Sequence, residues 1–375
     1  MKKHQKINNM KKLFTYMMLA GCLMLVALSS QAQFKPSDFS HKILEGKING
    51  RHKIKMLLNK RKRSKSIKNN LSGYYHYTRH RNYVILSKGT WKDNGSMLIE
   101  GGIRVKGKYI KTGAFSGRWN ADQKKLIGTW TATGGTKSFP FELYETYKSG
   151  RKEAEMQWMD ETTMFGEKAP RGAAVSFLYP VVKGGAVAQT INDYIQSNIL
   201  RNPQERTAKF IKNYLEDKKA RGFGDNYGYY EEHLTTINTN DKNILTLEYN
   251  LNGFSGGAHG YYNSSFTSFD LRTGQIIKMK DVFIPGFEGP IKQLIARQMR
   301  KDYGLKSDAP LTKLGLFKNE CPLPKNFYFR PDGVAFFYNV YEIAPYVAGA
   351  RTVVVPYKKL RRYIQRKSLA KKFFR

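Results

Sequence analysis

Hydrophobic and polar residues alternate in short runs between residues 34 and 150, and Gly, Asn and Asp separate these runs. A period of two, in runs rich in β-branched and aromatic residues, is typical of strands joined by turns. We therefore expect an all-β domain over residues 34–150, folded as a meander or a partly closed barrel. The expected strands are Ile54–Leu58, Tyr83–Leu86, Met97–Ile99, Ile103–Val105, Phe115–Trp119, Leu126–Thr131 and Phe139–Leu143.

A Gly-x-aromatic unit recurs in this region, and three of its copies contain Trp91, Trp119 and Trp130. A glycine within a strand leaves room for a neighbouring ring, so the repeat indicates hairpins stacked in one sheet. We interpret the three tryptophans as part of the core. A platform on which sugars stack is the alternative interpretation.

The pattern changes after a charged, Gly- and Pro-containing stretch at residues 145–172, which we interpret as a linker. Four apolar residues then recur at every fourth position, which predicts one face of a helix, and Asn202-Pro203 predicts its end and the cap of a second helix. Another helix is expected from Pro290, and a basic one from Tyr357 to Lys372. The apolar stripe consists of Val187, Ile191, Ile195 and Ile199, and the strands expected in this region include Val175–Tyr179, Phe327–Phe329, Val334–Tyr338 and Thr352–Val355.

Helices placed between strands predict an α+β fold with a largely antiparallel sheet. Residues 151–262 and 263–365 are expected to form a pair of mixed domains, followed by a basic tail at residues 366–375. Since the composition changes at the linker, we expect this pair to fold independently of the β-domain.

Between two expected strands lies the glycine-rich segment Leu251–Tyr262, with Gly256, Gly257 and Gly260 around His259. Such glycines indicate a backbone with positive φ or a close approach of another chain segment. Loops of this kind often carry function. The alternative is that the glycines only shape a turn, in which His259 binds a nearby carbonyl.

The first 33 residues have the pattern of a secretory signal, with Lys11-Lys12, an apolar run from Leu13 to Leu28, and a Ser30-Gln31-Ala32 cleavage site. The apolar run is shorter than the roughly 20 residues that a spanning helix needs, so we expect no transmembrane span. The predicted location is periplasmic or secreted. The sequence around Cys22 also fits a lipobox, which leaves a lipoprotein anchored at Cys22 as the alternative.

The formal net charge is +36, and two stretches, 51–68 and 357–375, each hold nine lysines or arginines and no acidic residue. Such stretches create a field that attracts anionic surfaces. For an exported protein we expect anionic cell-envelope material as the partner and no nucleic acid. After signal removal Cys321 is the single cysteine, so we expect no disulfide.

Several motifs between residues 155 and 365 resemble the extracytoplasmic domain pair of the RsiV/PdaC type. These motifs are Phe177-Leu178-Tyr179-Pro180, Gly256-Gly257-Ala258-His259-Gly260, Phe269-Asp270-Leu271 with Thr273-Gly274, and Tyr341-Glu342-Ile343-Ala344-Pro345-Tyr346 with Gly349 before Val353-Val354-Val355-Pro356-Tyr357. Within this family the pair occurs in an anti-sigma factor that binds lysozyme and in front of a polysaccharide deacetylase domain. Residues 34–375 contain neither a spanning hydrophobic run nor a deacetylase sequence, so we expect neither activity here.

The resemblance places the His259 loop and the loop from Tyr341 to Gly349 in the same domain pair. We predict that the two loops meet at one end of the sheet, and that glycines 256, 257, 260 and 349 shape them. The candidate ligand-binding residues are His259, Tyr261, Tyr341, Glu342 and Tyr346, because tyrosine combines contact area with a hydrogen-bonding tip.

The predicted function is an exported, noncatalytic envelope binding module for a glycan, a cell-wall component or a protein. The alternative is a hydrolase of envelope polysaccharide that uses His259 and Glu342 for acid-base chemistry. The sequence holds no zinc-ligand spacing and no phosphate loop, so no metal or cofactor is expected. The oligomeric state is left open.

Overall fold

A computed structural model of the protein describes residues 40–61, 71–80, 83–148, 150–164, 172–222 and 227–374. The predicted signal segment and Cys22 lie outside these residues, as does part of the first basic stretch. Within the described ranges, no helix has both the length and the hydrophobicity that a membrane span requires.

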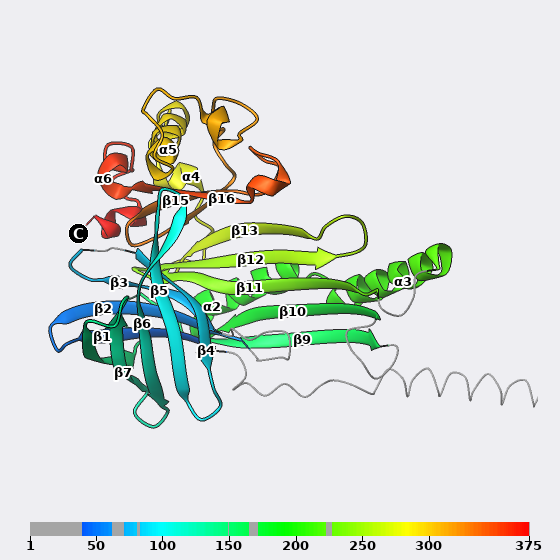
Figure 1. Cartoon of the computed structure of the whole chain (residues 1–375), viewed down its shortest axis with the longest axis horizontal. Coiled ribbons are helices and arrows are strands. Elements are labelled where there is room, and N and C mark those ends of the chain that lie inside the picture. Colours follow the sequence, from blue (N-terminus) through cyan, green and yellow to red (C-terminus); the bar gives the residue numbers. More distant parts are fainter. Residues whose placement is uncertain are drawn as a thin grey trace, which may run out of the picture. The chain divides into compact units, whose positions relative to one another are not determined.

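Eight antiparallel strands at the N-terminal side form a closed barrel (Figure 1). Closure comes from pairing of the first strand with the eighth, in the register from Leu44 opposite Glu145 to Ile48 opposite Phe141. The strands are β1 (Ser40–Ile48), β2 (His52–Lys60), β3 (Leu71–Tyr77), β4 (Tyr83–Trp91), β5 (Ser96–Val105), β6 (Lys108–Asn120), β7 (Lys125–Ala132) and β8 (Ser138–Glu145). The expected all-β domain is confirmed. Two of the predicted runs, 97–99 and 103–105, belong to one strand.

Side chains fill the interior of the barrel. Trp91 is buried in this core, and Trp119 and Trp130 are half-buried against it. The rings of Trp91 and Trp119 lie 6.0 Å apart between centroids, and Trp130 stacks on Phe139.

A second group of strands continues the same hydrogen-bonded sheet. It consists of β9 (Ala154–Met164), β10 (Gly172–Val182), β11 (Tyr229–Asp241), β12 (Ile244–Phe254) and β13 (Tyr261–Asp270), and β9 joins β1 through the pair Ser40–Glu155. All neighbours are antiparallel except β10 and β11. A parallel pair needs a crossover connection, and helices supply it here.

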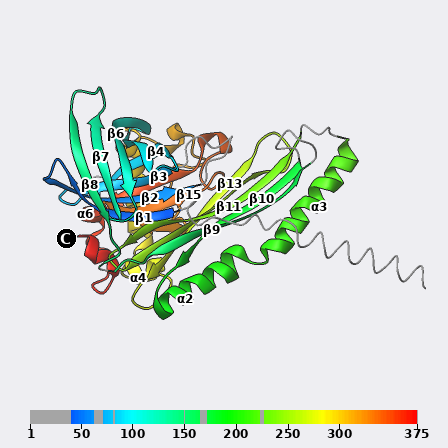
Figure 2. The same ribbon diagram turned by 90° about the horizontal axis from the view of Figure 1, so that it is seen from below.

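The crossover contains α2 (Gly185–Tyr194), a π-helical segment (Ile195–Leu200) and α3 (Pro203–Arg221). These helices lie along one face of the β9–β13 strands (Figure 2). The predicted apolar stripe faces the sheet, since Ile191, Ile195 and Ile199 are buried. Asn202 does not cap α3 as predicted: it has a φ of 51°, its side chain accepts no capping bond, and its amide nitrogen donates to Glu205.

The C-terminal part has its own three-stranded antiparallel sheet, β14 (Asn326–Phe329), β15 (Gly333–Tyr338) and β16 (Arg351–Pro356). Its helices are α4 (Met279–Val282), α5 (Glu288–Asp302), α6 (Tyr357–Leu360) and the 3₁₀ turns Leu311–Leu314, Tyr346–Ala348 and Leu369–Phe373. Strands with few helices and mostly antiparallel pairing confirm the α+β class.

The basic helix predicted from Tyr357 to Lys372 is wrong. The helix ends at Leu360, Ile364 then pairs with Phe283, and a 3₁₀ turn follows from Leu369. The side-chain amide of Gln365 donates to the carbonyls of two residues near α4. Tertiary contacts therefore use the apolar residues of this segment in several directions, and a single helical face cannot provide them.

Strand β13 is the edge of the sheet, and several of its outward backbone groups are occupied. The Asn339 side chain accepts from the Ser264 N–H (2.7 Å) and donates to the Ser264 carbonyl (3.0 Å). Asn326 accepts from the Phe266 N–H at 3.2 Å, and the Ser268 carbonyl accepts from Ile277 at 2.8 Å. The C-terminal part thus covers an edge that would otherwise be open to another strand.

Candidate functional site

The two loops that the sequence singles out are in contact. The His259 loop connects β12 to β13, and Tyr346 begins the 3₁₀ turn between β15 and β16. The rings of His259 and Tyr346 stack with centroids 4.0 Å apart and an interplanar angle of 20°. The Tyr346 hydroxyl donates to the Gly260 carbonyl at 2.8 Å, and His259 Nδ1 lies 2.8 Å from the same oxygen.

Two further tyrosines complete this aromatic cluster. Tyr262 meets the Tyr346 ring edge-on at 5.5 Å, and Tyr341 lies 5.9 Å from it. Tyr341 is 58% exposed and has a φ of 66°. Val347, next to Tyr346, is 92% exposed. The cluster is an exposed surface feature.

Tyr261 and Glu342 do not join it. Successive residues of a strand point to opposite faces, so Tyr262 faces Tyr346 while the Tyr261 hydroxyl donates to Glu231 at 2.6 Å on the other face. Glu342 is exposed and accepts a 3.3 Å bond from Asn339. The alternation of side chains between the two faces of the strand could have identified Tyr262, and not Tyr261, as the tyrosine that faces Tyr346.

The loop glycines occupy positions that other residues fit poorly. Gly256, Gly257 and Gly349 have φ values of 91°, 92° and 69°, a region that favours glycine. Gly260 has ordinary φ, but a Cβ there would lie 2.8 Å from the Gly253 carbonyl oxygen. Whether the cluster that these glycines shape binds a ligand stays a prediction.

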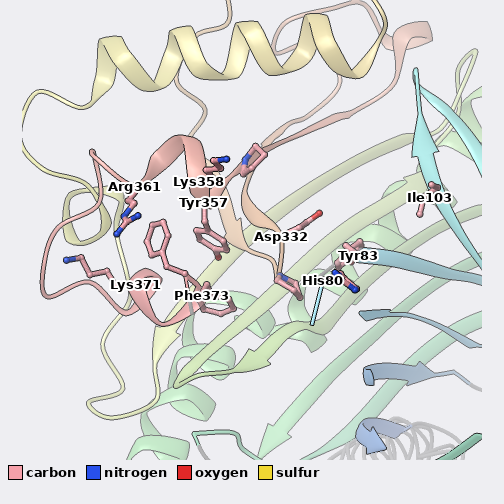
Figure 3. A pocket seen from close by; sticks show the side chains of 12 residues that line it. His80, Tyr83, Ile103, Asp332, Tyr357, Lys358, Arg361, Lys371 and Phe373 are labelled. Atoms are coloured by element: carbon pink, nitrogen blue, oxygen red, sulfur yellow. The ribbon is translucent and has the colours of Figure 1, made fainter. Parts of the chain in front are cut away.

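A cavity of about 1130 Å³ lies between the barrel and the C-terminal segment. Figure 3 shows His80 and Tyr83 on the barrel side, Asp332 between, and the C-terminal residues on the other side. Four aromatic rings, one histidine and three cations line it: Tyr83, Tyr357, Phe373 and Phe374, then His80, and then Lys358, Arg361 and Lys371.

The single carboxylate among the lining residues is already neutralised. Asp332 accepts two bonds from Arg330, at 2.9 and 2.8 Å, in a bidentate pair. Burial opposes the charge on Arg330, but its interactions with Asp332, Tyr83 and Tyr328 together outweigh burial, and the pKa of Arg330 is raised. The Arg330 guanidinium also lies 3.6 Å from the centroid of the Tyr83 ring, a cation–π contact.

Three cations of the cavity remain available for a ligand. Within the described part of the chain, Lys358, Arg361 and Lys371 form no ion pair with a carboxylate. Cations beside aromatic rings, with the one acid paired elsewhere, suit an anionic ligand that also has faces to stack. The basic stretch from residue 357 was the sequence signal for this cavity, but its aromatic partner Tyr83 comes from a distant strand and was missed.

Metal and thiol chemistry find no support in the described residues. No group of three His, Cys, Asp or Glu side chains there is arranged to hold a metal ion. Cys321 is buried, with Met299 Sδ 4.0 Å from its sulfur. Burial raises the pKa of the Cys321 thiol to about 11, so the reactive thiolate is disfavoured at neutral pH.

Residues 173–262 match the family model described as Deacetylase PdaC, and residues 280–358 match the model described as Protein of unknown function (DUF3298). Together the two matches correspond to a PdaC-like domain pair. This confirms the resemblance that the loop motifs indicated. The His259 loop lies in the PdaC match and the Tyr346 turn in the DUF3298 match, so their stacked rings join the two domains of the pair.

Solved structures of DUF3298 family members are similar to this chain. One from Bacteroides fragilis has 22% identity and a TM-score of 0.53, and the match covers 60% of this chain and 99% of that one. One from Pseudomonas aeruginosa has 17% identity and a TM-score of 0.39, covering 57% of this chain and 95% of that one. At this identity the first likeness supports the fold alone. No curated protein matches the chain.

Proposed function

We propose that this protein is an exported, noncatalytic binding protein that holds an anionic cell-envelope glycan in the cavity between the barrel and the C-terminal segment. The observation that carries the proposal is the lining of that cavity. It combines aromatic rings with Lys358, Arg361 and Lys371, and its one acid, Asp332, is paired with Arg330.

The cavity has the size and chemistry for a saccharide segment. Its volume of about 1130 Å³ slightly exceeds the roughly 300–1,000 Å³ typical of sites for small organic ligands. Aromatic rings offer flat apolar surfaces with a polar tip in tyrosine, and arginine binds carboxylate or phosphate through two parallel bonds. The net charge of +36 would add long-range attraction to an anionic polymer.

Polysaccharide hydrolysis through His259 and Glu342 is the weaker proposal. The two side chains have separate partners, since His259 bonds to the Gly260 carbonyl and Glu342 accepts from Asn339. A general acid or base must reach the proton that it transfers, either directly or through one water. A ligand that bridges these side chains would be needed to bring them into one reaction.

Cosedimentation of the full chain with isolated lipopolysaccharide and, separately, with purified peptidoglycan sacculi tests the binding proposal. Whichever of these polymers the original protein binds, the double variant Arg361→Gln with Lys371→Gln should bind it about tenfold more weakly, since it loses two charge-assisted contacts. Comparison of binding to lipopolysaccharide with binding to peptidoglycan identifies the source of the anionic glycan.

The matched control is Lys313→Gln with Lys318→Gln, two exposed lysines outside the cavity. It removes the same net charge and should change the dissociation constant less than about threefold, because exposed charges beyond about 8 Å are largely screened at physiological salt. Equal loss in both double variants would mean that overall charge, and not the cavity, holds the polymer. Retention that is unaffected in both would reject the proposal.

A further inference from the structure

A second, smaller cavity lies where the crossover helices are interrupted. The π-helical segment Ile195–Leu200 separates α2 from α3, and Asn202 has left-handed backbone at the break. π-Helical turns within α-helices occur frequently at functional sites. The cavity below the break, on the helix-covered face of the sheet, has a volume of about 250 Å³.

Its lining is polar and includes a cation. Tyr194, Asn198, Arg206, Tyr249, Ser265 and Thr267 contribute a guanidinium, an amide and four hydroxyls, and two aliphatic side chains complete the wall. The hydroxyls of Tyr194 and Thr267 lie 3.1 Å apart. No carboxylate lines the cavity, and within the described part of the chain Arg206 forms no ion pair.

Arg206 is held in place by contacts to the Ile199 carbonyl, to His233 and to the Tyr249 hydroxyl. One terminal nitrogen donates to the Ile199 carbonyl at 3.1 Å, and the other lies 3.0 Å from His233 Nδ1. His233 is 1% exposed and stacks on Phe177 with centroids 4.5 Å apart. A guanidinium has five N–H donors, so these contacts orient Arg206 and still leave donors for a ligand.

The carboxylate of Glu231 is occupied on the other side of His233. Glu231 is 2.6 Å from His233 Nε2 and accepts from Tyr261 at 2.6 Å. Burial alone would raise the pKa of Glu231, but the hydrogen bonds from His233 and Tyr261 lower it. Both oxygens of this carboxylate therefore have partners, and Arg206 is the charged group that faces the cavity.

We propose that this cavity binds one sugar acid, with its carboxylate at Arg206 and its ring hydroxyls at the surrounding hydroxyl and amide groups. A planar guanidinium fits a carboxylate, and the hydroxyl-rich wall fits a polyol. The volume is below that of sites for drug-sized ligands, so it limits the ligand to about one ring. This inference is independent of the glycan cavity.

Isothermal titration calorimetry of the full chain with sodium glucuronate, glucose and sodium acetate tests it. Glucuronate should bind saturably at one per chain. Glucose lacks the carboxylate and acetate lacks the ring hydroxyls, so each should bind about tenfold more weakly or worse. Absence of saturable glucuronate binding, or equal affinity for acetate, would reject the proposal.

Substitutions then locate the site. Ser265→Leu should fill the cavity and abolish binding, whereas Ser265→Ala, which adds no bulk but removes one hydroxyl contact, should weaken binding only about three- to tenfold. Arg206→Gln should weaken glucuronate binding about tenfold and leave glucose binding nearly unchanged. If Arg206→Gln does not fold, the comparison of Ser265→Leu with Ser265→Ala tests the location of the site. Binding that survives Ser265→Leu, or that is lost on Arg361→Gln in the larger cavity, would contradict this location.

Discussion

The side-chain amide of Asn339 binds both backbone polar groups of Ser264, as a neighbouring strand would. Both residues are buried. Asn339→Ala should lower the free energy of unfolding by about 2 kcal/mol, because a buried N–H and a buried carbonyl each lose a partner. Urea denaturation measures this. Asn263→Ala, at an exposed position beside Ser264, should change the value by less than about 0.5 kcal/mol, and an equal loss in both would contradict a specific role for Asn339.

Within the aromatic cluster, Tyr346 should contribute more to the free energy of unfolding than His259 does. The His259 ring is exposed and, among the described residues, stacks on Tyr346 alone, so His259→Ala should cost less than about 1.5 kcal/mol of unfolding free energy. Tyr346 contacts three rings and donates to Gly260, so Tyr346→Ala should cost about 2–3 kcal/mol. Thermal melts of the two variants check the order, and a larger loss for His259→Ala would show that the histidine is the main support.

The ion pairs of Arg151 predict that the protein loses stability at acid pH. Its side chain is 4% exposed and bonds to Glu45 at 2.5 Å and to Asp241 at 2.9 Å. Burial would raise the pKa of both carboxyls, but Arg151 and Lys55 lower it. This contribution to stability is therefore complete above the unfolded pKa values of about 4 and is lost as pH falls through the lower folded pKa values.

Arg151→Met should cost about 3 kcal/mol at pH 7, because two partly buried carboxylates lose the closer of their two shared cationic partners and keep only Lys55. Between pH 7 and pH 3 the variant should then lose less stability than the original protein, since Lys55 is then the main cation that opposes the effect of burial and the folded pKa values of the two carboxyls lie closer to the unfolded ones. Urea denaturation at several pH values measures this. Arg104→Met, at an exposed arginine, is the control and should keep the original pH profile.

The C-terminal segment should stabilise the fold in spite of its basic composition. Phe373 is buried and stacks on Tyr357 and Phe329, with centroids 5.5 and 6.2 Å apart. Phe373→Ala should cost about 3–5 kcal/mol. Phe317→Ala removes an exposed ring and should cost less than about 0.5 kcal/mol. A small effect of Phe373→Ala in denaturant unfolding would mean that the last residues are a solvated tail.

Local patterns predicted most strands and helices of this chain, because period-two alternation and four-residue stripes reflect which face of an element is buried. Glycine at positions 256 and 257 likewise predicted an irregular loop, and family motifs placed this loop with Tyr346. The strand β1 was missed because Ser40–Ile48 contains His, Lys, Glu and Gly, and its pairing with both β2 and β8 depends on residues far away in sequence.

The features that the sequence did not predict depend on contacts between residues that are far apart in the chain. A charge pattern from residue 357 indicated an anion-binding surface, but which aromatic residues it faces depends on how the barrel meets the C-terminal segment. Similarly, Arg206 and Ser265 meet only through the crossover of α2 and α3 over the sheet. The helix that was predicted up to Lys372 was wrong for the same reason, since both the backbone N–H and the side-chain amide of Gln365 donate to carbonyls of α4.

The occupied edge of β13 has a consequence for contacts between molecules. An extended segment of another chain that reached Ser264 would find its N–H and carbonyl already bound to Asn339, and Asn326 holds the next outward position at Phe266. Intermolecular sheet growth at this edge would first require the release of two asparagines that belong to the C-terminal part. Loss of Asn339 would thus expose a template for aggregation in addition to weakening the fold.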